Sequence, residues 1–134
     1  MSEFTRQQID FMRQACLLCD NSELEVRTGC VVVLGVDVIG EGWNQKEFKG
    51  DVVHAEVVAI RDVEKTSGDL MDASVFVSRF PCIKCAEMLV KKEVGEIFYM
   101  SDHFTSGNEA LPIFEEAGIE VIHIPEEVVW NSKE

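Results

Sequence analysis

The chain has 134 residues, near the common size of one domain, and its 46% hydrophobic content is enough for a core. Its 12 Lys and Arg against 25 Asp and Glu give a net charge of −13, which disfavours a polynucleotide partner because nucleic-acid binding needs a basic face. No apolar run approaches the roughly 20 residues of a membrane span, and residues 1–5 do not resemble a basic, apolar leader. Five cysteines, an odd number, favour a reducing compartment over a disulfide framework. We therefore expect a cytoplasmic protein with a small-molecule substrate and no membrane partner.

Helical and strand patterns alternate along the chain. In order, the sequence predicts a helix over 5–20, strands over 29–34 and 37–41, a polar loop at 49–51, a helix over 54–65, a strand over 74–78, a helix from Pro81, a strand over 95–100, a helix over 108–117 and a strand over 119–124. This alternation predicts an α/β/α layered fold in which the late strands pair in parallel. No repeat, low-complexity stretch or linker divides the sequence, so we expect one domain over residues 1–134.

Two short motifs, His54-Ala55-Glu56 and Pro81-Cys82-Ile83-Lys84-Cys85, carry the chemistry that the sequence shows most clearly. The imidazole of His54 and the thiolates of Cys82 and Cys85 are zinc ligands. Three protein ligands leave the fourth tetrahedral position open, and an open position is where zinc activates water. The motifs therefore predict a catalytic zinc site.

The spacing of these residues also predicts where they lie on helices. His54 and Glu56 diverge by roughly 200° in a helix interior, so both reach one cavity only at a helix N-terminus. Cys82 and Cys85 are three apart on one helical face, and Pro81 suits the first helical position because it has no N–H to leave unpaired. The N-terminal end of a helix also lowers the pKa of a thiol. We expect two helix N-termini to converge on one metal.

Other candidates have plainer interpretations. Cys16 and Cys19 repeat the three-residue spacing, but their apolar neighbours favour a helix core over a second metal. A structural zinc would need a fourth ligand, and none stands at the usual spacing. His123 lies on an apolar strand, which favours a structural role, and Asp102 and His103 are candidates for the mouth of the site.

The combination of H-x-E with P-C-x-x-C is the signature of the zinc-dependent nucleobase deaminases. The whole chain resembles the cytidine deaminase superfamily, since residues 28–33 are similar to its opening strand and residues 40–44 to its Gly-x-Asn element. The resemblance implies a three-layer α/β/α cytidine deaminase-like fold with a five-stranded mixed sheet, and Zn²⁺ as the cofactor. By analogy it also implies a homo-oligomer.

Within the superfamily, Phe80-Pro81-Cys82 and the stretches 99–104 and 114–121 are similar to the deoxycytidylate deaminases. This resemblance implies hydrolytic deamination of a cytosine nucleotide, dCMP to dUMP, with release of ammonia. Val58 stands where that branch has Asn, and Gly42-Trp43-Asn44 is a form found in tRNA adenosine deaminases. Three alternatives stay open: a deaminase of a free nucleoside or base (cytidine, guanine or another aminated heterocycle), a deaminase of tRNA adenosine, and a deaminase-fold protein that binds a nucleotide without turnover.

The resemblance also implies roles for individual residues. His54, Cys82 and Cys85 hold the zinc, and Glu56 is the catalytic residue that moves protons from the attacking water to N3 of the ring and to the amine leaving C4.

The implied substrate contacts are Asn44 to the base or sugar, the Ala55 backbone N–H to the base carbonyl, and Phe80 against the ring. Arg79 is a candidate phosphate contact, with a solvated loop cation as the alternative. The net charge leaves room for a local basic pocket, for which the candidates are Arg27, Lys46, Lys49 and Arg79.

Overall fold

The structure, a computed structural model, describes residues 4–47, 50–66, 69–101 and 106–131. Its elements are α1 (Arg6–Leu18), the 3₁₀ turn η1 (Cys19–Asn21), β1 (Gly29–Leu34), β2 (Asp37–Trp43), β3 (Gln45–Lys46), β4 (Val52–Val53), α2 (Ala55–Glu64), β5 (Ser74–Arg79), α3 (Ile83–Lys91), β6 (Glu96–Ser101), α4 (Ser106–Glu116), β7 (Glu120–His123) and α5 (Glu126–Asn131). The predicted elements are all present, with their ends within two residues of the prediction. Within the described ranges, no helix is long and apolar enough to cross a bilayer.

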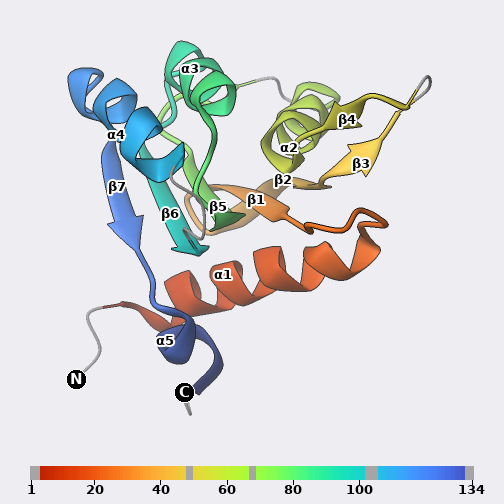
Figure 1. The fold of residues 1–134 in the computed structure, drawn as a ribbon. Helices are drawn as coiled ribbons and strands as arrows, with labels where there is room; N and C mark the ends of the chain where they lie inside the picture. The colour runs from red at the N-terminus through yellow and green to blue at the C-terminus, as the bar shows by residue number, and fades with distance from the viewer. Residues whose placement is uncertain (1–3, 48–49, 67–68, 102–105, 132–134) are drawn as a thin grey trace.

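A five-stranded mixed sheet forms the middle layer, with strand order β2-β1-β5-β6-β7. β1 runs antiparallel to both β2 and β5, whereas β5, β6 and β7 are mutually parallel. Helices α1 and α5 cover one face of this sheet, and α2, α3 and α4 cover the other (Figure 1). The predicted α/β/α layering, the five-stranded mixed sheet and the parallel late strands are confirmed.

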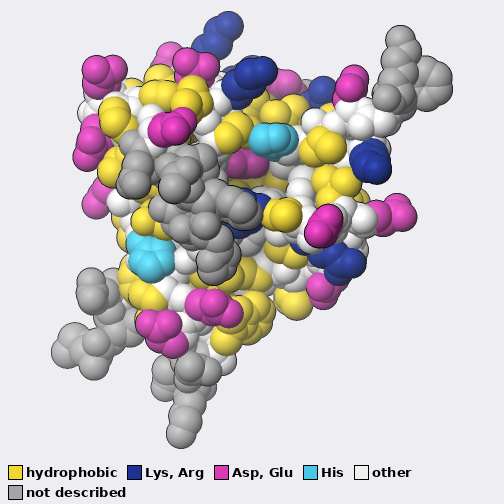
Figure 2. All heavy atoms as spheres, in the orientation of Figure 1, with side chains coloured by type: hydrophobic (Ala, Val, Ile, Leu, Met, Phe, Trp, Pro, Cys, Tyr) yellow, Lys and Arg dark blue, Asp and Glu magenta, His cyan; other side chains and the backbone are white. Residues whose placement is uncertain are grey.

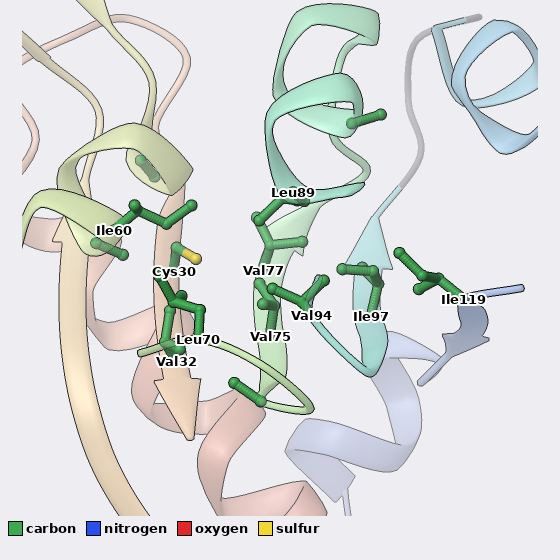
Figure 3. Packing of buried hydrophobic residues seen from close by; sticks show 14 of the residues in the cluster. Cys30, Val32, Ile60, Leu70, Val75, Val77, Leu89, Val94, Ile97 and Ile119 are labelled. Atoms are coloured by element: carbon green, nitrogen blue, oxygen red, sulfur yellow. The ribbon is translucent and has the colours of Figure 1, made fainter. Parts of the chain in front are cut away.

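Apolar side chains fill the space on both sides of the sheet. On the face that carries α2 and α3, Val75, Val77 and Ile97 from the strands pack with Ile60 and Leu89 from the helices (Figure 3). On the α1 face, a second cluster contains Met12, Phe76, Phe98, Ile124 and Val129. Burial of these two layers is what holds the helices against the sheet.

Glycines in β2 let helix α2 approach the sheet closely. A Cβ atom at Gly42 would lie 2.5 Å from the Ala59 nitrogen and 2.6 Å from the Ala55 carbonyl oxygen. Real Cβ contacts are longer than this, so the first turn of α2 rests directly on the glycine backbone. The sequence Gly40-Glu41-Gly42 thereby fixes the height of the α2 N-terminus above the sheet.

The start of α3 differs from the prediction. The sequence predicts Pro81 at the first helical position, but the helix begins at Ile83 with Cys82 as its N-cap in extended conformation. The Phe80 N–H still donates to the Ser101 carbonyl at 2.8 Å, so pairing with β6 continues beyond the end of β5. The chain needs two further residues to turn into the helix, and this places Pro81 before the cap.

The segment between β2 and α2 also holds more structure than predicted. β3 and β4 pair antiparallel in a small hairpin, and the polar loop predicted at 49–51 lies between these two strands in the sequence. Gly50 donates its N–H to the Glu47 carbonyl at 2.9 Å, and Lys49 lies outside the described residues. Each of these strands has two residues, too few to show an alternating pattern in the sequence.

Candidate active site

Two helix N-termini bring the predicted ligands together. His54 is the N-cap of α2 and Cys82 the N-cap of α3, both with extended backbone and neither with a side-chain capping hydrogen bond. Their carbonyls accept the first helical hydrogen bonds, from Val58 at 3.1 Å and from Ala86 at 2.8 Å. Because the imidazole and the thiol do not cap their own helices, both side chains can point into the space between them.

The three ligand atoms have the spacing of a zinc site. The Nδ1 atom of His54 lies 3.5 Å from Sγ of Cys82 and 3.4 Å from Sγ of Cys85, and all three atoms lie within 4.8 Å of one another. Zinc bonds of about 2.3 Å to sulfur and 2.0–2.1 Å to nitrogen at a tetrahedral angle require N···S separations of about 3.6 Å. The donor set therefore fits Zn²⁺. Within the described part of the chain, no other three His, Cys, Asp or Glu ligand atoms come as close together.

The proton affinities of these ligands also depend on their contact. Hydrogen bonds with the Cys85 thiol and with His54 lower the pKa of Cys82 to about 3. The same contact with Cys82, together with burial, raises the pKa of Cys85, and the hydrogen bond with Cys82 raises the pKa of His54. Of the two thiols, that of Cys82 therefore gives up its proton more readily. Zinc binds cysteine as thiolate and releases its protons, so these three groups are matched to a cation.

Glu56 lies at the second position of α2 and is only 4% exposed. Burial raises the pKa of its carboxyl group to about 7. It stands outside the ligand group but lines the same cavity as His54 and Cys82. A carboxyl group with a pKa near neutrality that is not a metal ligand is suited to accept and return protons.

A cavity of about 330 Å³ opens beside the ligands. Its volume is in the range of small-molecule sites. The lining residues are Leu24, Val26, Thr28, Asn44, Val52, His54, Ala55, Glu56, Arg79, Phe80 and Cys82. The residues predicted as metal ligands, proton carrier and substrate contacts are all among them except Cys85, which is buried and contacts His54.

Phe80 and Arg79 reach the cavity from the end of β5. The Phe80 ring is 8% exposed and packs edge-on against Tyr99, with ring centroids 4.7 Å apart, and against Phe114 at 6.2 Å. Packing on two sides fixes the orientation of this ring. Arg79 lines the cavity, and its positive charge acts on both His54 and Glu56.

Asn44 directly follows β2 and also lines the cavity. Its side chain is 9% exposed, and both ends of its amide are hydrogen-bonded to the segment that precedes β1. The amide oxygen accepts from the Thr28 N–H at 2.9 Å, and the amide nitrogen donates to the Val26 carbonyl at 2.6 Å.

Sequence reasoning missed the apolar wall of the cavity. Leu24 and Val26 lie in an irregular segment, and Val52 lies in the unpredicted hairpin. An apolar residue in a predicted loop is a weak signal on its own, since exposed apolar residues are common. Of the cations proposed for a basic pocket, Arg79 lines the cavity, whereas Arg27 and Lys46 are exposed and are not among its lining residues.

The remaining candidates lie apart from the ligand group. The Cys16 thiol donates to Sδ of Met100 at 3.6 Å, and Sγ of Cys19 lies 3.4 Å from Oγ of Ser78. His123 is exposed, and its Nε2 lies 2.8 Å from the Met100 carbonyl oxygen. Asp102 and His103 lie outside the described residues.

Comparison with known proteins gives several matches. The family model of the cytidine and deoxycytidylate deaminase zinc-binding region matches residues 5–101. A tRNA-specific adenosine deaminase of Streptococcus pyogenes serotype M18 is 30% identical over 98 residues, which are 69% of this chain and 62% of that protein. The riboflavin biosynthesis protein RibD of Chlamydia trachomatis is 35% identical over 108 residues, 73% of this chain and 27% of RibD.

Among solved structures, the apo dCMP deaminase of the cyanophage S-TIM5 superposes with a TM-score of 0.79 at 21% identity, covering 90% of this chain and 100% of that one. At this identity the superposition shows the shared fold. The chain spans about three fifths of the length of the Streptococcus relative and about a quarter of RibD. The family match covers both zinc motifs up to the end of β6. The chain therefore belongs to the cytidine and deoxycytidylate deaminase family, whose zinc-binding region it matches.

Proposed function

We propose that this chain is a zinc-dependent hydrolytic deaminase whose substrate is a cytosine nucleotide, dCMP, converted to dUMP with release of ammonia. One observation carries the proposal of a deaminase: a three-ligand zinc group and the buried, non-ligating carboxyl group of Glu56 share one cavity. Three ligands leave a coordination position for water, and Glu56 is the proton carrier beside it.

Zinc bound by His54, Cys82 and Cys85 would supply a Lewis acid that makes water nucleophilic near neutral pH. Glu56 accepts a proton from that water as its oxygen forms a bond to C4 of the base. It delivers this proton to N3, accepts the second proton from the hydroxyl group now on C4 and passes it to the amine, and the bond between C4 and the amine nitrogen breaks. Water supplies one oxygen and two protons, which balances the release of ammonia. A pKa of about 7 lets Glu56 both accept and donate in this cycle.

The substrate contacts in this proposal come from three residues on the cavity wall. Ala55 is the first residue of α2, where backbone N–H groups have no partner within the helix, and its N–H would hold the base carbonyl. The Phe80 ring would lie against the base. Arg79 would bind the phosphate, because its charge lies at the cavity and an Arg–phosphate contact is charge-assisted.

The net charge of −13 supports a small substrate over a polyanion. On the face that Figure 2 shows, Lys and Arg side chains are interspersed with acidic ones. The Streptococcus relative nevertheless makes tRNA adenosine the second candidate. Deamination of a free nucleoside or base, and nucleotide binding without turnover, remain alternatives to be tested. The same proposal includes a single deaminase domain over 1–134, a homo-oligomer and a cytoplasmic location.

The experiment is a deamination screen with zinc-loaded protein. Substrates are dCMP, deoxycytidine, cytidine, guanine and a tRNA anticodon arm, with ammonia release as the readout and Glu56→Ala as the inactive control. We expect the highest kcat/KM for dCMP. A preference for a nucleoside, a base or the tRNA arm overturns the nucleotide assignment and leaves the deaminase assignment standing. Zinc-loaded protein that turns over none of these substrates overturns the nucleotide assignment and favours either another aminated heterocycle as the substrate or nucleotide binding without turnover.

A further inference from the structure

A second group of sulfur atoms lies on the face of the sheet that α1 covers, whereas the zinc ligands lie on the face that α2 and α3 cover (Figure 1). Cys16 stands in the last turn of α1, and Cys19 is the C-cap of that helix. Both thiols are free and partly exposed. The deaminase chemistry proposed above uses neither of them.

Two residues of the sheet contact this pair of thiols. Sγ of Cys16 lies 3.6 Å from Sδ of Met100, and Sγ of Cys19 lies 3.4 Å from Oγ of Ser78. Ser78 and Met100 are neighbours on the parallel strands β5 and β6, since the register pairs the residues on either side of them. Two side chains from α1 and two from the sheet therefore meet at one place.

The sulfur atoms are spaced closely enough to share one ion. Residues three apart on a helix have Cβ atoms about 5–6 Å from each other, so the thiols of Cys16 and Cys19 can reach a common ligand. Metal–sulfur bonds of about 2.3 Å at trigonal angles place the sulfur atoms about 4 Å apart. The separation between Cys16 and Met100 is close to this value. The apolar neighbours of the two cysteines predicted a helix core, and the contact with Met100 adds a third sulfur that the sequence spacing does not show.

This set of donors favours a soft cation. Thiolate and thioether ligands together select Cu⁺, whereas Zn²⁺ takes thiolate, imidazole and carboxylate ligands. Cys19 stands at the C-terminal end of α1, where the helix dipole favours a positive charge. Burial raises the pKa of Cys16 to about 12 and raises the pKa of Cys19 as well. Reactive Cys-x-x-Cys pairs have thiols of lowered pKa, so this pair is better suited to hold a cation than to act as a nucleophile.

We propose that Cys16, Cys19 and Met100 form a second metal site, which binds Cu⁺ in preference to Zn²⁺. On binding, two S–H bonds break, two Cu–S bonds form and two protons pass to the solvent. The thioether of Met100 adds a lone pair as the third donor, and Cys19 turns its side chain from Ser78 toward the ion. Copper stays Cu⁺, so no electron is transferred. The proposal does not rest on the proposed function, because no substrate or turnover enters it.

The first test counts metals in the zinc-loaded protein. Cu⁺ is added under anaerobic conditions against a competing chelator, and native mass spectrometry measures zinc and copper in each chain. We expect one zinc and one copper in the wild type, and no second zinc when Zn²⁺ is added in place of Cu⁺. A chain that takes up no copper, or that holds two zinc ions, overturns the proposal.

The thioether has its own variant. Met100→Leu keeps an apolar side chain of similar volume and removes the sulfur. It should weaken Cu⁺ binding about 10- to 100-fold, as the loss of a supporting group at a metal site does. The matched control is Met71→Leu, at a methionine that is 54% exposed, which should leave Cu⁺ binding unchanged. Equal affinities in wild type and Met100→Leu would remove Met100 from the site and overturn the three-sulfur proposal.

The second test locates the copper. Peptide mass spectrometry after timed alkylation at alkaline pH compares the zinc-loaded protein with and without Cu⁺. Cys16 and Cys19 should be alkylated more slowly when Cu⁺ is present, with zinc retained at Cys82 and Cys85. Copper uptake with loss of zinc and unchanged alkylation of Cys16 and Cys19 would place the copper at the zinc ligands and overturn the proposal.

The serine variants complete the assignment. Cys16→Ser and Cys19→Ser should each lose copper and keep zinc, and a full equivalent of copper in either variant counts against the proposal. Should a serine variant not fold, the alkylation of the wild type and the affinity of Met100→Leu still decide it.

Discussion

The Nδ1 atom of His54 lies 3.4 Å from Sγ of Cys85, although the two residues are 31 positions apart in the sequence. The contact joins the N-cap of α2 to the first turn of α3. Because the two ligands come from two helices, zinc affinity should depend on the packing of both helices as well as on the ligands.

We predict that each chain holds one zinc ion through His54, Cys82 and Cys85. Cys82→Ser should lose the metal, since serine does not supply the soft thiolate that zinc binds. Cys16→Ser should keep it, because Cys16 contacts Met100 and lies outside the ligand group. Metal analysis of the purified variants by mass spectrometry gives the stoichiometry. A full equivalent of zinc in Cys82→Ser, or its loss in Cys16→Ser, would show that the ligand set is wrong.

Glu56→Ala should retain zinc and lose activity. General acid–base groups contribute about 10²- to 10⁴-fold, and kcat/KM should fall by at least that amount. The matched control is Glu87→Ala, which removes an exposed carboxylate from the other zinc-bearing helix and should leave activity unchanged. Wild-type rates in Glu56→Ala, with the metal content equal, would remove Glu56 from the mechanism.

Gly42→Ala should destabilise the protein. The added Cβ would lie 2.5 Å from the Ala59 nitrogen and 2.6 Å from the Ala55 oxygen, and both are backbone atoms that move only with α2. Overpacking of this kind costs about 1–3 kcal/mol of the free energy of unfolding. Urea denaturation measures this change in the free energy of unfolding. The control is Val36→Ala, which should have little effect because Val36 is 64% exposed. Because α2 carries His54, zinc affinity should fall as well.

The thiol of Cys16 should ionise at a higher pH than the thiol of a free cysteine. Burial, followed by the nearby Cys19 and Glu126, raises the pKa of Cys16 to about 12. The thiolate is the reactive form, so its alkylation rate should rise about tenfold per pH unit from pH 8 to 10. An ordinary thiol instead levels off near its pKa of about 8.5. Peptide mass spectrometry after timed alkylation of zinc-loaded protein measures this, and a plateau below pH 9.5 would contradict the pKa.

The metal centre was predictable from the sequence because few residues determine it. A histidine two positions before a glutamate and two cysteines three positions apart have to lie at helix N-termini in order to share a cavity. The position of Pro81 was not predictable in the same way, since it depends on the pairing of Phe80 with Ser101 across the sheet.

The substrate side of the cavity was less accessible to sequence reasoning for a physical reason. Leu24, Val26 and Val52 lie in an irregular segment and a two-residue strand, whose conformations are set by tertiary contacts and leave no periodic pattern. The Asn44 amide is hydrogen-bonded to Thr28 and Val26, which lie 16 and 18 positions earlier in the sequence. No rule for neighbouring residues predicts such a pairing. The ligand group is therefore determined more locally than the walls of the cavity.

Arg79 is the residue whose replacement should separate nucleotide from nucleoside. If it binds the phosphate, Arg79→Ala loses a charge-assisted contact of roughly 1.5–3 kcal/mol, and kcat/KM for dCMP should fall about 10- to 100-fold. Deoxycytidine lacks the phosphate, so its kcat/KM should change by less than about threefold. The matched control is Lys84→Ala, which removes an exposed cation of α3 that is not among the lining residues and should leave both substrates unchanged. Equal losses for dCMP and deoxycytidine in Arg79→Ala would show that Arg79 acts on the base or on Glu56, and would withdraw the phosphate contact from the proposed function.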